Sequence, residues 1–197
     1  MLDFGSCELD FKVKCYTNIK WIYEKFKNSN IKFVYKFEES DICIVDKNYK
    51  FVGEDINSSF KISIDGVNDK VDAFIDRNNI EAYLNIIDKY ESGNYEVGMA
   101  DFSDIKEVTR GSLIEYVKIN INNNSNYIEL EEFRKSFKQR EVNVDAILVT
   151  SFKDLDKLAN YVNTLEDIYS NMNIVIITLV DMENQKGNCI EVFLFKK

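Results

Sequence analysis

The stretch VDAILVTSFKDLDKLANYVNTLEDIYSNMNIVIITLV, residues 144–180, decides the fold class of this chain. It begins and ends with apolar runs that are typical of buried strands, at 144–150 and 173–180. Between them Ser151 and Asp154 resemble a capping box, and apolar residues then recur at helical spacing: Leu155, Leu158, Ala159, Val162, Leu165 and Ile168. Strand, helix and strand in this order imply a crossover connection, with the helix packed on a sheet.

The flanking segments continue this alternation. Residues 113–121 (LIEYVKINI) alternate apolar and polar side chains, as a half-buried strand does, and a helix is expected from about Tyr127 to Arg140. Residues 189–195 are expected to form a closing strand that pairs with 173–180 as an antiparallel hairpin. We therefore predict an α/β (α+β) fold with mixed sheets flanked by helices.

The first half of the chain shows a similar pattern. Its expected elements are strands at 9–15, 31–37, 42–46 and 60–65 and a helix from Thr17 to Asn28. A long helix is expected over 71–90, with an interruption near 77–79. We divide the chain into an N-terminal α/β portion, residues 1–95, which ends in this helix, and a C-terminal α/β domain, residues 96–197.

The composition restricts the possible partners. The chain carries 25 Lys and Arg against 34 Asp and Glu, a net charge of −9, and its basic residues are scattered, so nucleic acid is not expected as a partner. No apolar run has the length of a membrane span, and the first residues are too acidic for a secretory signal. A cytoplasmic location is expected.

Catalytic chemistry has no recognisable machinery in this sequence. The chain has no histidine, and no Ser or Cys stands next to a credible base, so nucleophilic catalysis is not expected. The cysteines are widely spaced and form no CxxC pair, which favours buried free thiols over a zinc site: Cys7, Cys15, Cys43 and Cys189.

The segment VGMADFSDIKEV, residues 97–108, follows the expected long helix and carries a family resemblance. In FtsZ, the bacterial homologue of tubulin, the loop after the central helix has the order asparagine, apolar, aspartate, phenylalanine, alanine, aspartate. Met99 to Asp104 (MADFSD) match this loop, and Ile105 and Val108 continue its apolar helix face. Over residues 80–197 the chain therefore resembles the C-terminal region of the FtsZ/tubulin family, its second domain.

The sequence departs from the family pattern at the residues that would bind a nucleotide. Met99 replaces the asparagine, and the Gly-rich phosphate-binding stretch is missing, because Gly5, Gly53 and Gly66 are isolated. A triphosphate needs close backbone approach, which glycine clusters provide. We predict neither a nucleotide site nor any other cofactor.

The resemblance implies a role for Asp101, Phe102 and Asp104, because the family inserts this loop into the nucleotide pocket of the next subunit, where its aspartates polarise the attacking water. The structural alternative is that Asp101 caps a helix and Asp104 lies in its first turn. We predict a non-enzymatic, degenerate FtsZ/tubulin-like protein that acts by protein–protein contacts or self-association, with cytoskeletal filaments as the expected target. The alternative is a small acidic α/β enzyme or ligand sensor whose site consists of carboxylates and tyrosines.

Overall fold

The computed structural model describes residues 13–51, 59–66, 70–91, 95–96, 102–121, 126–137, 143–150, 155–169, 171–179 and 188–197. Its strands are β1 (Lys14–Thr17), β2 (Lys32–Phe33), β3 (Ile42–Asp46), β4 (Phe60–Ile64), β5 (Ala73–Phe74), β6 (Tyr95–Glu96), β7 (Gly111–Ile121), β8 (Val144–Thr150), β9 (Ile174–Leu179) and β10 (Asn188–Lys196). Its helices are α1 (Lys20–Phe26), the 3-10 turn η1 (Phe37–Glu39), α2 (Ile80–Glu91), α3 (Phe102–Thr109), α4 (Asn126–Lys135) and α5 (Leu155–Ile168).

All the described strands belong to one mixed sheet, in the order β2-β1-β3-β4-β5-β7-β10-β8-β9-β6. Neighbours are parallel from β2 through β7, and β10 is antiparallel to both β7 and β8. The predicted fold class, α/β with mixed strands and flanking helices, is confirmed. The division into portions 1–95 and 96–197 stays a prediction.

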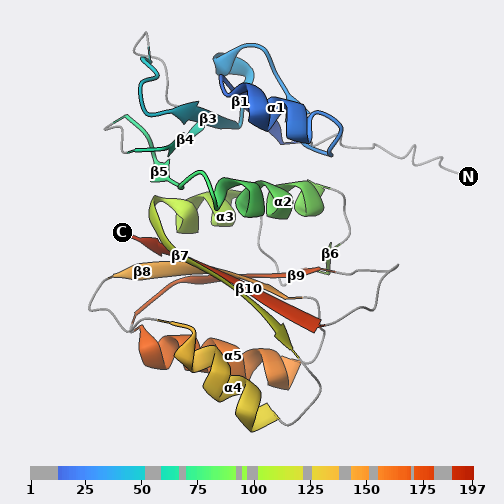
Figure 1. The fold of residues 1–197 in the computed structure, drawn as a ribbon, viewed down its shortest axis with the longest axis vertical. Coiled ribbons are helices and arrows are strands. Elements are labelled where there is room, and N and C mark those ends of the chain that lie inside the picture. Colours follow the sequence, from blue (N-terminus) through green and yellow to red (C-terminus); the bar gives the residue numbers. More distant parts are fainter. Residues whose placement is uncertain are drawn as a thin grey trace, which may run out of the picture.

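Helices α2 to α5 form two layers, while α1 lies beside the N-terminal strands (Figure 1). α2 and α3 lie between the N-terminal and the C-terminal strands, while α4 and α5 cover the far side of the C-terminal strands. One core cluster joins α1, α2 and α3 to strands of both halves, and a second lies under α4 and α5. The hydrophobic effect therefore holds the two halves of the sheet against the same central helices.

The predicted hairpin between 173–180 and 189–195 is wrong. β10 lies between β7 and β8, and β9 pairs in parallel with β8 instead. Val192 and Leu194 enter the core under α4 and α5, whereas Phe193 and Phe195 enter the core around α2. A strand that is covered on both faces is apolar throughout. Such a pattern indicates that the strand is buried, but it does not indicate which strands pair with it.

The helix predicted over 71–90 is shorter in the structure. Its first residues include β5, Ala73–Phe74, and the helix α2 begins only at Ile80. The backbone N–H groups of Asn78 and Asn79 donate to Asp76 Oδ1, at 2.8 Å and 3.2 Å. This turn lets β5 pair with β4 and β7 before the helix starts, at the interruption that the sequence shows near 77–79.

The prediction that the cysteines are buried free thiols is confirmed for two of them in the described part of the chain. Cys15 and Cys43 are free and buried, while Cys189 is partly exposed and Cys7 lies outside the described residues. Burial raises the pKa of Cys43 to about 12, and that of Cys15 still further above its usual range. Both therefore stay protonated and behave as small hydrophobic side chains.

Candidate functional site

The segment that resembles the FtsZ loop ends in α3, which has one buried and one exposed face. Ile105 and Val108 are buried in the central core, and Phe102 packs against it. Asp104 and Glu107 are exposed, Asp104 in the first turn. Asp101 lies outside the described residues, so its predicted capping role stays a prediction. α3 thus presents Asp104 to solvent from a helix that is anchored in the core.

The C-terminal end of α3 is fixed by a lysine. Lys197 Nζ donates to the carbonyl oxygens of Glu107, at 2.8 Å, and Val108, at 3.2 Å. The same ammonium pairs with Asp145 Oδ2 at 2.9 Å, and Asp145 Oδ1 accepts from the backbone N–H of Asn173 at 2.8 Å. A cation at the last carbonyls of a helix is favourable, and here it connects α3 to β8 and to the start of β9.

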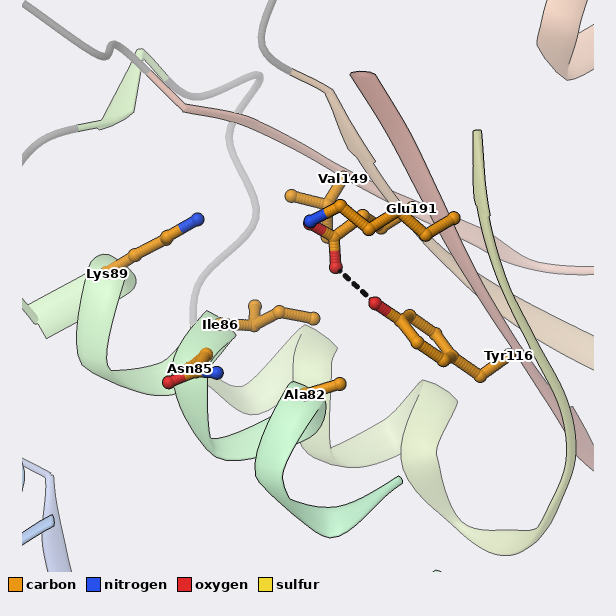
Figure 2. Close-up of a pocket in the computed structure, with 8 residues that line it drawn as sticks. Ala82, Asn85, Ile86, Lys89, Tyr116, Val149 and Glu191 are labelled. Atoms are coloured by element: carbon orange, nitrogen blue, oxygen red, sulfur yellow. Dashed lines mark hydrogen bonds and ion pairs between the residues drawn. The ribbon is translucent and has the colours of Figure 1, made fainter. Parts of the chain in front are cut away.

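A cavity of about 330 Å³ lies between α2 and the sheet (Figure 2). The helix wall consists of residues that share one face at spacings of three and four: Ala82, Asn85, Ile86 and Lys89. The sheet wall consists of Tyr116 and Lys118 from β7, Val149 from β8 and Glu191 from β10. Polar side chains thus occupy a stretch of the sheet that faces the central helix.

Glu191 is the centre of the polar part of this cavity. Its Oε2 accepts from the Tyr116 hydroxyl at 2.7 Å, and its Oε1 accepts from Lys118 Nζ at 2.8 Å. The Tyr116 ring also packs against Phe193, with ring centroids 4.5 Å apart. Glu191 is only 8% exposed. Figure 2 shows the tyrosine hydroxyl directed at the carboxylate.

The charge states in this cluster follow from its contacts. Burial opposes the ionisation of Glu191, but hydrogen bonds from Lys118 and Tyr116 outweigh it and lower the pKa of the carboxyl. Burial, together with the bond to Glu191, raises the pKa of Tyr116, and the same carboxylate raises the pKa of Lys118. At neutral pH the cluster therefore contains a carboxylate, an ammonium and a neutral phenol.

Sequence reasoning missed this cluster. In the sequence Glu191 lies 75 residues after Tyr116 and 73 residues after Lys118, so no local spacing joins it to them. One signal was present: Tyr116 and Lys118 are two residues apart in an alternating strand and must share a face. The paired position in β10 is Glu191, which stands opposite Lys118 in the strand register.

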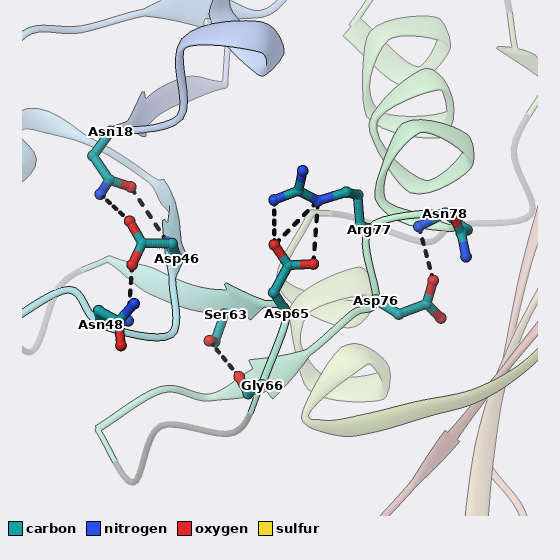
Figure 3. A network of polar contacts seen from close by, with 9 residues as sticks. All are labelled: Asn18, Asp46, Asn48, Ser63, Asp65, Gly66, Asp76, Arg77 and Asn78. Carbon is teal, nitrogen blue, oxygen red and sulfur yellow. Dashed lines mark hydrogen bonds and ion pairs between the residues drawn. The ribbon is translucent and has the colours of Figure 1, made fainter.

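A third polar region lies at the carboxyl ends of the N-terminal parallel strands (Figure 3). Parallel sheets bind ligands at this edge, above all where the strand order reverses, which here is between β1 and β3. At that point Asn18 Nδ2 donates to Asp46 Oδ2, and the Asn48 N–H donates to Asp46 Oδ1, both at 2.8 Å. The groups of this edge bond mainly to one another.

The electrostatics of this edge disfavour phosphate. Asp46 is the last residue of β3, whereas Asp65 and Asp76 follow β4 and β5. The Arg77 guanidinium is paired with the Asp65 carboxylate. A nucleotide placed at the switch point between β1 and β3 would bring its phosphates close to the Asp46 carboxylate, and like charges repel. The local turns also lack the glycine cluster that lets backbone amides approach phosphate.

We accordingly expect the chain to bind neither GTP nor ATP. Isothermal titration calorimetry of the full chain with each nucleotide and Mg²⁺ is expected to show no saturable heat. Saturable binding at micromolar concentration would contradict this assignment of the edge.

Comparison with known proteins adds a likeness of fold. No protein-family model matches the chain, and no curated protein does. Solved structures do resemble it. The FtsZ dimer of M. jannaschii shares 10% identity with a TM-score of 0.47, and CetZ1 of Haloferax volcanii, a GDP-bound monomer, shares 12% with a TM-score of 0.43. TubZ of Bacillus thuringiensis serovar israelensis, in GDP-form protofilaments, shares 11% with a TM-score of 0.44.

The solved structures that resemble the chain include members of the FtsZ/tubulin family, the family whose resemblance the sequence predicted. These similarities cover 80–82% of this chain. The chain spans only 62–65% of the length of these FtsZ/tubulin structures.

Two further observations concern the described residues alone. None of their helices combines the length and the apolar character needed to cross a membrane. Within the same ranges, no group of three or more acidic, cysteine or histidine side chains is placed to hold a metal ion.

Proposed function

We propose that this chain is a non-enzymatic, FtsZ/tubulin-like protein of the cytoplasm that acts by protein–protein contacts on cytoskeletal filaments. The observation that carries the proposal is the combination of two surfaces. α3 presents the acidic turn that resembles the FtsZ loop, whereas the edge where a nucleotide would bind is lined with carboxylates. Such a chain has a surface for entering a neighbour's pocket, whereas its described strand ends are unfavourable for the nucleotide that the next subunit would contact.

The rigidity of α3 supports a contact role. Ile105 and Val108 fix its inner face, and Lys197 fixes its last carbonyls. A preformed surface loses little conformational entropy on docking, so a partner gains more affinity from each contact with Asp104. A chain that docks in this way ends filament growth at that point and acts at low stoichiometry.

The test is the mass of filaments formed by an FtsZ-type protein from the same cell, followed by sedimentation or light scattering. Adding the chain below equimolar amounts is expected to lower this mass, and Asp104→Ala is expected to abolish the effect. The substitution costs about 0.3–1 kcal/mol of helix stability, too little to unfold the domain.

Asp156→Ala is the matched control for this experiment. Asp156 is also an exposed acidic residue in the first turn of a helix, but it lies on α5, at the far side of the C-terminal strands. The control variant is expected to act as the unsubstituted chain does. Unchanged filament mass at equimolar protein, with the partner shown to assemble normally, would contradict the proposal.

A second candidate function is ligand binding at a carboxylate and tyrosine site. The observation that favours it is the cavity beside Glu191, where an ionised carboxylate and a neutral phenol converge with a lysine. A buried charged group is costly and is often retained at a functional site. The contacts of this cluster support binding rather than catalysis, because Tyr116 and Lys118 both hydrogen-bond to Glu191.

A further inference from the structure

We propose that the cavity between α2 and the sheet binds a small organic anion that has one carboxylate and a short apolar body. This inference rests on the second candidate function, ligand binding, and names its ligand class. It is independent of the filament contact through α3.

The charges of the lining residues favour an anionic ligand over a cationic one. The Glu191 carboxylate is already paired with the Lys118 ammonium and accepts a hydrogen bond from Tyr116, so its negative charge is balanced within the chain. Lys118 uses one N–H for Glu191, and an ammonium has three; its side chain is 50% exposed and reaches the cavity. Lys89 adds a second ammonium on the helix wall. The lining residues thus carry one more positive than negative charge, in a chain whose net charge is −9.

The remaining lining residues select a ligand with an apolar part. Ala82, Ile86 and Val149 contribute hydrocarbon surface between the two charged walls. Ile86 and Val149 belong to the central core, so this part of the cavity is continuous with it. A volume of about 330 Å³ is near the lower end for ligand sites and fits a molecule of the size of a substituted benzene ring.

The same features disfavour inorganic phosphate. A compact dianion would have to lose its hydration shell against hydrocarbon on one side and the Glu191 carboxylate on the other. A monocarboxylate places its charge at Lys118 and its apolar body on Ile86 and Val149, so it satisfies both parts of the lining.

The experiment uses the full chain and sodium benzoate as the probe, with binding followed by calorimetry and by ¹H–¹⁵N NMR shifts. Benzyl alcohol and benzylamine, which have the same ring, serve as neutral and cationic comparisons, and inorganic phosphate as an anion without an apolar body. Benzoate is expected to bind at one site, with shifts in α2 and β7, and more tightly than the other three compounds.

Two variants test the assignment. Lys118→Met is expected to weaken benzoate binding about tenfold or more, because one charge-assisted hydrogen bond is lost. Ala82→Leu fills the cavity without changing any charge, and it is expected to remove binding while the NMR spectrum stays that of a folded chain. Lys32→Met, on the edge strand β2 far from β10 in the sheet, is the control and is expected to leave binding unchanged.

The outcomes separate the ligand class from the ligand-binding function. Binding of benzylamine in preference to benzoate, or phosphate binding as tight as benzoate, would overturn the ligand class and leave a binding site in place. Absence of saturable shifts with all four compounds would contradict both. Benzoate binding that persists in Ala82→Leu would overturn the location in this cavity.

Discussion

Replacing Gly111 by alanine is expected to lower the free energy of unfolding by about 3–5 kcal/mol, the sum of backbone strain and overpacking. Gly111 has φ +112°, a conformation that side-chain-bearing residues rarely adopt. A Cβ at this position would lie 2.0 Å from the carbonyl oxygen of Lys196, which is backbone and cannot rotate away. Gly111 also pairs with Ala73, at the point where β7 joins the N-terminal strands.

Gly66→Ala is the matched control for this prediction. Gly66 also has a positive φ, of +152°, but its added Cβ would meet Lys47 Cδ at 3.0 Å, in a flexible side chain. The control is expected to cost about 1–2 kcal/mol, from backbone strain alone. Urea denaturation of both variants measures the difference. An equal loss of unfolding free energy in the two variants would show that the contact with the Lys196 carbonyl oxygen does not destabilise Gly111→Ala.

Replacing Asp145 by alanine is the second large effect, with an expected loss of about 2–3 kcal/mol. Asp145 is 5% exposed, and it is paired with Lys197 and with the backbone N–H of Asn173. Without its carboxylate, the Lys197 ammonium, on a side chain that is 24% exposed, and a backbone donor lose their partner at once. Because Lys197 also holds the last carbonyls of α3, the amides of this helix are expected to exchange hydrogen faster.

A double substitution separates the charge from the packing. In Asp145→Ala with Lys197→Met no unpaired ammonium remains, so part of the lost stability is expected to return relative to Asp145→Ala alone. Chemical denaturation of the single and double variants, with hydrogen exchange of α3 as a second readout, measures this coupling. If the loss of unfolding free energy in the double variant equalled the sum of the losses in the two single variants, a direct role for the ion pair would be excluded.

The candidate sites differ in how far the sequence could reveal them. Asp104 could be proposed from the sequence because the FtsZ-like loop is contiguous, and its role stays a prediction; α3 places it on an exposed face, as amphipathic spacing predicts. The cavity was not found, because Glu191 meets Lys118 only through the register of β10 on β7. Contiguous motifs are local, whereas a site between a helix and a sheet depends on which strands are neighbours.

Residue patterning was sufficient to predict the principal elements of the second half. β8, α5 and β9 lie where the pattern of 144–180 predicts them, since each apolar periodicity is compatible with one kind of backbone. The position of β10 between β7 and β8, and the formation of β5 within the expected helix, could be read only from the folded chain. The physical reason is that periodicity records which faces are buried, while strand pairing is set by backbone hydrogen bonds between distant segments. These bonds involve the same N–H and C=O groups in every residue except proline, which this chain lacks, so the side-chain pattern does not identify the neighbour.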